Sequence, residues 1–368
     1  MRVALVHDWL NTRVGGSEQV LLELARLYPD APIYTLWFRP EYYQGLIDPS
    51  RVRTSSLNKW PHWLTKKPHY LLGLLPTAIE SFDLSDFDVV ISSSNAFSKG
   101  VITRPETLHV SYCYSPMRFA WDYWPRYLDE QQIGPLRRMV ATRLISRVRL
   151  WDYYSSKRVD HWLTISKTVA ARIEKYYGAT AEVIHPPVAT SQFGPAKTKD
   201  DYYVTLGTLT PYKRIDQAIT VAGKTKRQLI VIGDGFDRPR LERLAGPTVR
   251  LAGRIDPSQK AELLAGARAL IHPGEEDFGL APVEAMASGT PVVAYGRGGA
   301  SETVTAQTGV LYDQATPAAL ETALDHFETK TWDRHVLVTR AAEFDQAHFA
   351  KHFTKRVAEL ARDHGITP

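Results

Sequence analysis

The chain alternates between short apolar runs and amphipathic segments, and this alternation most constrains its fold. Runs that resemble strands stand at 2–9, 31–37, 88–94, 108–114 and 161–166. After the first run, apolar residues recur at helical spacing from Ser17, the expected N-cap, to Pro29. Strands that alternate with helices are typical of a parallel α/β sheet. The first half therefore predicts a doubly wound α/β domain.

A second alternation begins at residue 202 after a stretch without apolar periodicity. Its expected strands are 202–208, 228–235, 249–253, 268–274, 291–295 and 309–313. At 368 residues the chain also exceeds what one hydrophobic core usually organises. We therefore expect two doubly wound, Rossmann-like domains that face an interdomain cleft. The expected ranges are a first domain at 1–185, a linker at 186–201, a second domain at 202–345, and a C-terminal helix at 346–368 that packs back on the first domain.

Composition narrows the compartment and the partners. Cys113 is the only cysteine, which excludes an internal disulfide and a cysteine-based zinc cluster. No apolar run reaches the 18 or so residues of a membrane span, and the start lacks a basic leader. These features predict a cytoplasmic protein. Basic residues without a recognised nucleic-acid-binding signature give no reason to expect DNA or RNA as a partner.

The excess positive charge lies in the first half of the chain. Residues 1–185 hold 23 of the 45 Lys and Arg and 18 of the 40 Asp and Glu, which leaves 22 of each for the remainder. Eight of the nine tryptophans lie there too, with Trp332 outside. A basic, aromatic half suits an acidic and apolar partner, such as an anionic phospholipid surface or a lipid-linked substrate.

Two stretches of this half have an interfacial composition. Residues 57–76 mix lysines with Trp60, Trp63 and Tyr70, and residues 136–158 combine an apolar stripe with several arginines. Together they predict peripheral binding to the inner face of the cytoplasmic membrane. A core helix with a solvated basic face is the alternative for 136–158.

The loop around Phe278-Gly279-Leu280 carries the strongest chemical signal. Pro282 suits a first helical position and Gly289 a C-terminal stop, so a helix should start just after this turn. A helix start offers amides and a dipole to phosphate. Glu276 and Glu284 flank the turn and can accept hydrogen bonds from sugar hydroxyls. This arrangement predicts binding of a nucleoside diphosphate sugar; a Glu in a first helical turn is also favourable for the dipole alone.

The segment EDFGLAPVEAMASGTPVVA resembles the signature of family four glycosyltransferases, which have the GT-B fold of two Rossmann-like domains. Other matches follow in order along nearly the whole chain. They are Gly15-Gly16, PYKRID at 211–216, GDG at 233–235, GRID at 253–256 and GGASE at 298–302.

This resemblance implies transfer of a sugar from a nucleotide sugar, the co-substrate, with retention of configuration and with neither metal nor cofactor. By position, Glu276 lies near the donor sugar, Glu284 near the ribose, and Lys213 with Arg214 near the diphosphate. Lys213 and Glu276 are the first catalytic candidates. The remaining implied donor contacts are Gly15, Gly16, Thr208, Gly233, Arg254, Ile255, Phe278, Gly279 and Leu280. For the Gly15-Gly16 pair an ordinary tight turn is the alternative.

The chain departs from the family pattern at two positions. Tyr114 stands where the family has a histidine that contacts the donor sugar, and Thr208 stands where it has a phosphate-binding arginine. Tyrosine can keep the contact, so Tyr114 is a third catalytic candidate, but it is a poor base at neutral pH. Lys213 and Arg214 must then carry more of the diphosphate charge.

The acceptor is expected to meet the first domain. Arg118 can bind a phosphate of the donor or the acceptor, or it can form an ion pair with Asp122. His7 and Asp8 end the first strand, where either an acceptor role or a satisfied strand-end pair fits.

Residues 1–10, 31–37 and 115–122 are similar to the matching stretches of mannosyltransferases in this family, and this resemblance implies a retaining mannosyltransferase that uses GDP-mannose. Its expected acceptor is a lipid-linked saccharide or another polysaccharide precursor. The alternatives are a UDP-sugar donor, or a weakened GT-B protein that binds a nucleotide sugar or saccharide without transferring it.

Overall fold

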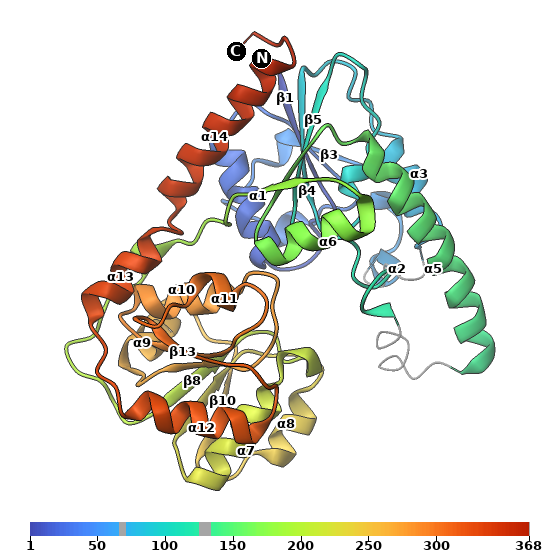
Figure 1. Cartoon of the computed structure of the whole chain (residues 1–368). Coiled ribbons are helices and arrows are strands. Elements are labelled where there is room, and N and C mark those ends of the chain that lie inside the picture. Colours follow the sequence, from blue (N-terminus) through green and yellow to red (C-terminus); the bar gives the residue numbers. More distant parts are fainter. Residues whose placement is uncertain (66–70, 125–133, 368) are drawn as a thin grey trace. The chain divides into compact units, whose positions relative to one another are not determined.

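The structure is a computed structural model that describes residues 1–65, 71–124 and 134–367. The chain forms two compact units (Figure 1). Unit 1 contains residues 1–185 and the residues from Ala350 onward, and unit 2 contains Pro186–Phe349. The polypeptide therefore leaves unit 1 once and returns to it.

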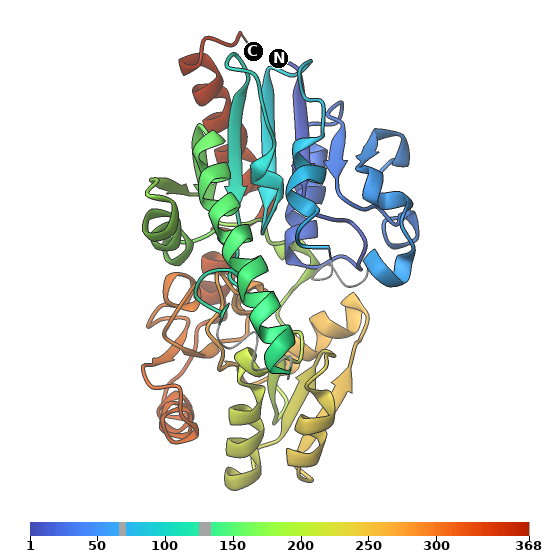
Figure 2. The ribbon, with the colours of Figure 1, turned by 90° about the vertical axis from the view of Figure 1, so that its right-hand side faces the viewer.

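Unit 1 is built on a parallel sheet with strand order β3-β2-β1-β4-β5-β6-β7. Its strands are β1 (Val3–His7), β2 (Ile33–Thr35), β3 (Val52–Thr54), β4 (Val89–Ser94), β5 (Leu108–Cys113), β6 (His161–Thr164) and β7 (Ala181–Val183). The central strands β4 and β5 are buried along their whole length, as expected for a parallel sheet covered on both faces. Figure 2 shows helices in front of and behind these strands.

The helices of unit 1 differ in how much of their surface is covered. They are α1 (Gly16–Leu27), α2 (His62–Thr65), α3 (Leu75–Glu80), α5 (Pro135–Ser155), α6 (Lys167–Tyr177) and most of α14 (Gln346–Asp363). Helix α14 packs on the sheet through Phe353, whose ring lies 5.7 Å from that of Tyr112, and Arg356 of the same helix pairs with Glu182. The C-terminal helix thus completes unit 1.

Unit 2 contains a parallel sheet with strand order β10-β9-β8-β11-β12-β13. Its strands are β8 (Tyr203–Leu206), β9 (Leu229–Ile232), β10 (Val249–Gly253), β11 (Leu270–His272), β12 (Val292–Tyr295) and β13 (Gly309–Tyr312). Its helices are α7 (Ile215–Thr225), α8 (Arg238–Leu244), α9 (Pro257–Gly266), α10 (Leu280–Ala287), α11 (Ala300–Thr303), α12 (Pro317–Glu328) and α13 (Arg334–Ala342).

Both sheets have the same doubly wound order, so each has one point where the strand order reverses. This point lies between β1 and β4 in unit 1 and between β8 and β11 in unit 2. In such sheets, ligands bind beyond the carboxyl ends of the strands at this switch point. The topology therefore directs attention to the loops after β1, β4, β8 and β11.

The helix starts differ from those predicted. Helix α1 begins at Gly16, so its N-cap is Gly15 rather than the predicted Ser17. The Glu18 carboxylate stabilises this start, because it accepts a 2.9 Å hydrogen bond from the Gly15 N–H. Helix α10 begins at Leu280, so Pro282 is its third residue rather than its first. A proline is tolerated there because the first-turn N–H groups have no intrahelical acceptor.

The segment expected to be a linker is held on unit 2. Lys199 donates to the carbonyl of Ala265 at 2.7 Å, and Arg334 donates to that of Ala196 at 2.7 Å. Residues 186–201 therefore behave as part of a packed domain rather than as a free tether. Within the ranges that the structure describes, no helix is both long and apolar enough to span a bilayer.

Candidate functional site

A charged pair lies at the switch point of unit 2. Lys213 ends the turn that follows β8, and Glu276 lies in the loop that follows β11. The Lys213 Nζ and Glu276 Oε1 atoms are 2.6 Å apart, and the two side chains keep 14% and 18% of their surface exposed. Two residues 63 positions apart in the sequence are thus brought together by the order of the strands.

Glycines allow the backbones around this pair to approach closely. A Cβ added to Gly274 would lie 2.7 Å from the Lys213 Cα, and one added to Gly233 would lie 1.9 Å from the Gly207 carbonyl oxygen. Gly233 also has a φ of 133°, which favours glycine. The predicted donor residue Gly233 is therefore needed for the packing of the loops after β8 and β9.

The electrostatics keep both members of the pair charged. Burial alone would raise the pKa of Glu276, but Lys213 and His272 together hold it below its ordinary value. Burial would likewise lower the pKa of Lys213, but Glu276 raises it above its ordinary value. The site therefore presents an ammonium and a carboxylate over a wide pH range.

His272 was missed by the sequence analysis and lies beside this pair. It ends β11, is 3% exposed, and places its Nε2 atom 3.5 Å from Glu276 Oε1. Burial lowers its pKa and Lys213 adds to this, whereas Glu276 acts in the opposite direction. Only the position of this histidine at the end of an expected strand was visible in the sequence.

Glu284 forms a second ion pair on unit 2. Its carboxylate lies 2.8 Å from Nζ of Lys260, a residue of α9 that the sequence analysis did not select. Lys260 also stacks over the ring of Phe193, 5.2 Å from its centroid. Glu275, by contrast, is exposed. The two predicted donor carboxylates are thus each paired with a different lysine.

The other predicted donor residues of unit 2 occupy loops at the same edge of the sheet. Phe278 is buried against Phe344, and Gly279 has a φ of 80° as the N-cap of α10, which Leu280 begins. Thr208 is exposed after β8, and Arg254 and Ile255 follow β10. Arg214 caps α7 with a φ of 52° and lies 3.6 Å from Asp216.

The switch point of unit 1 is filled by its own hydrogen bonds. The two carboxylate oxygens of Asp8 accept four backbone N–H groups, from residues 95 to 98, at 2.6 to 2.9 Å. Asp8 is 1% exposed. The acceptor role predicted for Asp8 is therefore corrected: its carboxylate anchors the loop after β4 and has no face left for a ligand.

Tyr114 and His7 belong to the same buried network. The Ser93 hydroxyl lies 2.9 Å from His7 Nδ1 and 2.7 Å from the Tyr114 hydroxyl, which donates to the Ser17 carbonyl at 3.1 Å. The second ring nitrogen of His7 lies 4.0 Å from Glu18. His7 is thus a satisfied strand-end residue. Burial raises the pKa of Tyr114, although the bond to Ser93 lowers it in part, so this hydroxyl stays protonated.

The remaining predicted residues of unit 1 also have local partners. Arg118 lies 3.5 Å from Asp122, the ion pair considered as the alternative to phosphate binding, and is 32% exposed. The Gly15 N–H is used by Glu18. Gly16 is the first residue of α1. Glu18 and Ser93 were missed because a Gly-x-x-Glu capping box and a serine near the end of a strand have no distinctive spacing.

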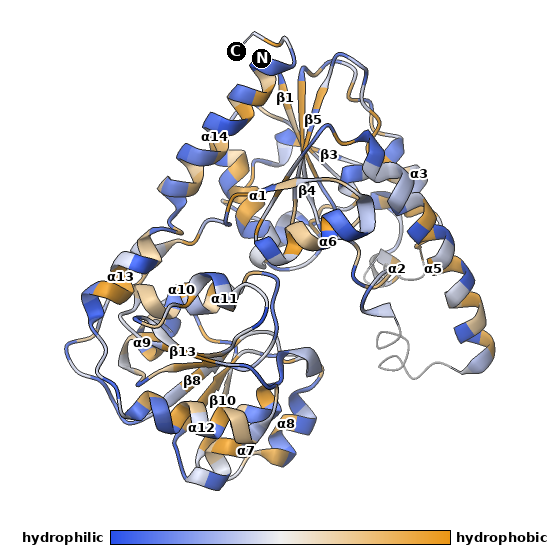
Figure 3. Cartoon of the chain, in the orientation of Figure 1, coloured by the Kyte–Doolittle hydropathy of each residue, from blue (hydrophilic) through white to orange (hydrophobic). Residues whose placement is uncertain are grey.

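The two stretches with interfacial composition are exposed in part. Trp63 is 69% exposed, and Lys66, Lys67 and Tyr70 lie outside the described residues. In α5, Ile145 and Val148 are buried, but Leu136 and Val140 are 70% and 58% exposed. Figure 3 shows hydrophobic and hydrophilic residues mixed along this helix. The core-helix alternative therefore holds for the C-terminal half of α5 alone.

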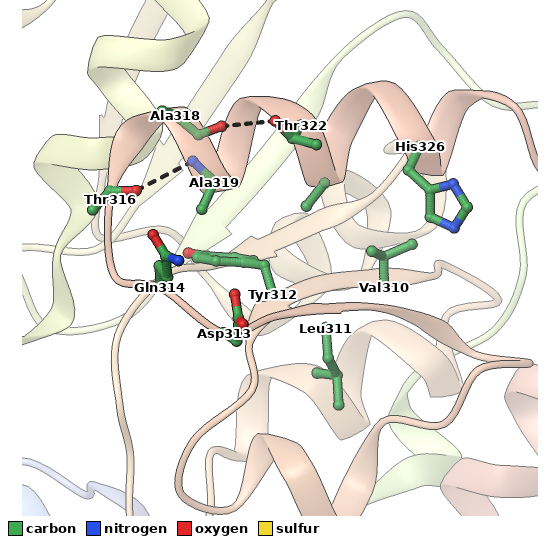
Figure 4. Close-up of a pocket in the computed structure, with 11 residues that line it drawn as sticks. Val310, Leu311, Tyr312, Asp313, Gln314, Thr316, Ala318, Ala319, Thr322 and His326 are labelled. Carbon is green, nitrogen blue, oxygen red and sulfur yellow. Dashed lines mark hydrogen bonds between the residues drawn. The ribbon is translucent and has the colours of Figure 1, made fainter.

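A wide depression elsewhere on unit 2 contains none of the predicted site residues. It has a volume of about 500 Å³ and lies between β13 and α12 (Figure 4). Its lining includes Tyr312, Asp313 and His326. Within the part of the chain that the structure describes, no group of three or more His, Cys, Asp or Glu side chains is arranged to hold a metal ion.

Two family models match the chain in tandem. The model described as Glycosyltransferase Family 4 matches residues 14–192, and the model described as Glycosyl transferases group 1 matches residues 189–344. Together they span both units.

Curated relatives match part of the chain. A GDP-mannose-dependent alpha-mannosyltransferase of Mycolicibacterium smegmatis is 36% identical over 124 residues, which are 33% of this chain and 33% of the relative. The O-antigen chain mannosyltransferase RfbU of Salmonella typhimurium is 32% identical over 151 residues, which are 38% of this chain and 43% of the relative. The chain thus matches less than half the length of these relatives.

Solved structures match the whole chain. Sucrose-phosphate synthase from Thermosynechococcus elongatus gives a TM-score of 0.73 at 18% identity, over 98% of this chain and 99% of that one. Anabaena Alr3699/HepE in complex with UDP gives 0.67 at 15% identity, over 98% and 100%. These likenesses, with the two parallel sheets, establish the GT-B fold of two Rossmann-like domains.

Proposed function

Because the chain belongs to glycosyltransferase family 4, we propose that it is a retaining glycosyltransferase that moves mannose from GDP-mannose to a lipid-linked or other polysaccharide-precursor acceptor. The observation that carries the proposal is the charged Lys213–Glu276 pair at the switch point of unit 2. An ammonium held there suits a diphosphate, and a carboxylate beside it suits the hydroxyls of the attached sugar.

In the proposed reaction, the bond between the sugar C1 and the diphosphate oxygen breaks, and a bond from C1 to the acceptor oxygen forms on the same face. The proton of the acceptor hydroxyl passes to the departing diphosphate. Lys213 stabilises the charge that develops on this leaving group. In the proposal, this ammonium takes the role that a metal ion would otherwise have. Glu276 orients the sugar and Glu284 the ribose. A covalent sugar adduct on Glu276 would contradict this scheme.

The donor is proposed from the relatives. The relatives from Mycolicibacterium smegmatis and Salmonella typhimurium are named as mannosyltransferases, and the first is named as GDP-mannose-dependent. A UDP-sugar is the second candidate, since Alr3699/HepE was solved in complex with UDP and with UDP-glucose. The two donors share the diphosphate and differ in base and sugar.

A panel of sugar nucleotides tests the activity and the donor together. We expect release of GDP from GDP-mannose, stimulated by lipid extract, with weaker or no release of UDP from UDP-sugars. Preferred turnover of a UDP-sugar would replace the donor and keep the activity. Tight binding of a sugar nucleotide without turnover of any donor would instead favour the weakened binding protein.

We further propose that unit 1 binds the inner face of the cytoplasmic membrane. The support is the exposed Trp63 of α2, and the exposed Leu136 and Val140 on α5, a helix that also carries exposed arginines. Flotation with anionic liposomes at low salt should recover the protein, and the double substitution L136S/V140S should reduce recovery. The matched control is Leu311→Ser, at a 40% exposed leucine of unit 2. Equal recovery of all three proteins, or none of the unmodified protein, would contradict membrane binding.

A further inference from the structure

Glu276 has two basic neighbours. Among the residues that the structure describes, Lys213 and His272 are the basic groups within 4 Å of its carboxylate, at 2.6 and 3.5 Å. The first contact is a short ion pair. The second is a near approach without a hydrogen bond, because His272 Nε2 is buried and has no hydrogen-bond partner in the described chain.

Binding of a diphosphate changes the partner of Lys213. The lysine is the charged group proposed to meet the diphosphate, and phosphate oxygens compete with Glu276 for its three N–H donors, so a shift of the ammonium toward the ligand lengthens the 2.6 Å contact. Glu276 would then be a largely buried carboxylate without a cation. An uncompensated buried charge is costly, so the site needs a second basic group.

His272 is the group placed for this purpose. It ends β11 and is 3% exposed, which holds its ring in place. A Cβ on Gly279 would lie 3.2 Å from its Nε2 atom, so the absence of a side chain at Gly279 leaves room for this edge of the ring. The ring nitrogen without a partner therefore faces the carboxylate that loses one.

We propose that His272 is a positioning residue that takes over Glu276 when a nucleoside diphosphate draws Lys213 away. The imidazole binds one proton from solvent, and its Nε2–H then donates to Glu276, which keeps the carboxylate oriented toward the sugar. No covalent bond changes. The inference rests on the proposed function, because that function supplies the diphosphate.

The charges around His272 support this exchange. In the free site, burial and Lys213 lower the pKa of His272, and Glu276 opposes them. Withdrawal of Lys213 and arrival of a dianionic ligand both favour the imidazolium. The pKa of His272 therefore rises on binding, so binding takes up protons and weakens as pH increases through the pKa of the bound state.

Isothermal titration calorimetry of GDP and UDP measures this linkage. Titrations near pH 7 in buffers with different ionisation enthalpies give the number of protons taken up. The unmodified protein should take up more protons per bound nucleotide than His272→Gln, by up to about one. As pH increases, the Kd of the unmodified protein should therefore rise more steeply than that of the variant, by up to about tenfold per pH unit. The matched control is His326→Gln, at the exposed histidine of α12 (Figure 4), which should behave as the unmodified protein.

The outcomes separate this inference from the proposed function. Binding of GDP or UDP with the same proton uptake in the unmodified protein and in His272→Gln would overturn the inference and leave the function standing. Binding of neither nucleotide would contradict both. The unmodified protein also gives an answer without any variant. If the number of protons taken up on binding is no greater than the change in protonation of the nucleotide phosphate alone, the exchange is contradicted. Histidine ¹⁵N spectra should show one neutral ring becoming an imidazolium on addition of GDP.

Discussion

The two switch points have the same topology and opposite chemistry. In unit 1 the loops after β1 and β4 are joined by Asp8, whose carboxylate is fully used by four backbone N–H groups. In unit 2 the loops after β8 and β11 meet through Lys213 and Glu276, which are partly exposed and pair with each other. The switch point of unit 1 stabilises its own loops, whereas the switch point of unit 2 keeps two charges that a ligand can engage.

This difference shows why strand order alone does not locate a site. A carboxylate that accepts hydrogen bonds from every side has no capacity left for a ligand. A lysine and a glutamate that hold each other can exchange partners, at the cost of one ion pair. Substitutions in unit 1 should therefore affect stability first, and substitutions in unit 2 should affect activity first.

The largest expected effect is on stability, from Asp8→Asn. The amide keeps one acceptor oxygen and turns an N–H₂ group toward backbone donors, so buried N–H groups lose their partner. We expect a loss of about 3–5 kcal/mol in the free energy of unfolding, measured by denaturant titration. Asp86→Asn, at an exposed aspartate of the same unit, should be neutral. If the Asp8→Asn protein were as stable as the unmodified protein and had a raised KM for the acceptor, the switch point of unit 1 would bind the acceptor rather than stabilise its loops.

The next effect is on activity, from Lys213→Ala. Removal of the ammonium beside the diphosphate should lower kcat by about 10²–10³, or about 3–4 kcal/mol, with little change in Tm. GDP release measures the effect. Lys224→Ala removes an exposed lysine of α7 that pairs with Glu321 and should keep full activity. If both variants were equally active, the charged pair of unit 2 would not be the donor site.

Acid should destabilise unit 1 through His109. Burial lowers the pKa of this histidine from 6.5 to about 4, so the unfolded chain binds a proton that the folded chain does not. Its contribution is complete above pH 6.5 and is lost as pH falls toward 4, by about 3 kcal/mol. Between pH 7 and 4, the free energy of unfolding of His109→Gln should therefore fall by about 3 kcal/mol less than that of the unmodified protein. Parallel curves for the two proteins would exclude His109 as the source.

The smallest effect is expected from Tyr114→Phe. The change removes a hydroxyl that contacts Ser93 and the Ser17 carbonyl, and His7 keeps its bond to Ser93. Stability should fall by about 1 kcal/mol, and kcat should change less than tenfold. A loss of activity above a hundredfold in a protein of normal Tm would instead make Tyr114 catalytic.

The parallel core was predictable from the sequence, and the edges were not. Buried strands such as β9 and β12 are continuous apolar runs. The edge strands β3 and β7 carry Arg53 and Glu182 toward solvent, and at three residues each they are too short for an alternation to stand out in the sequence.

The candidate site was predictable where a motif fixed its residues. Glu276, Glu284, Lys213 and Gly233 follow from motifs, and the structure adds that Gly233 is needed where two loops approach closely. His272 and Lys260 did not, because no motif marks either residue. The approach of His272 to Glu276, four residues on, depends on how the loop after β11 folds, and Lys260 pairs with Glu284, which is distant in sequence. The sequence left two roles open for Asp8, because its four donors come from residues 95 to 98, which are distant in sequence.

The return of the chain to unit 1 sets an order of synthesis. Unit 2 lies between two parts of unit 1, and its two ends are tied together where Val188 donates to the Phe344 carbonyl at 2.9 Å. Unit 2 has all its residues once Phe349 has been made, whereas unit 1 waits for α14. All seven strands that the structure describes in unit 1 are made before unit 2, and the surface of that sheet that receives Phe353 stays uncovered until α14 has been made.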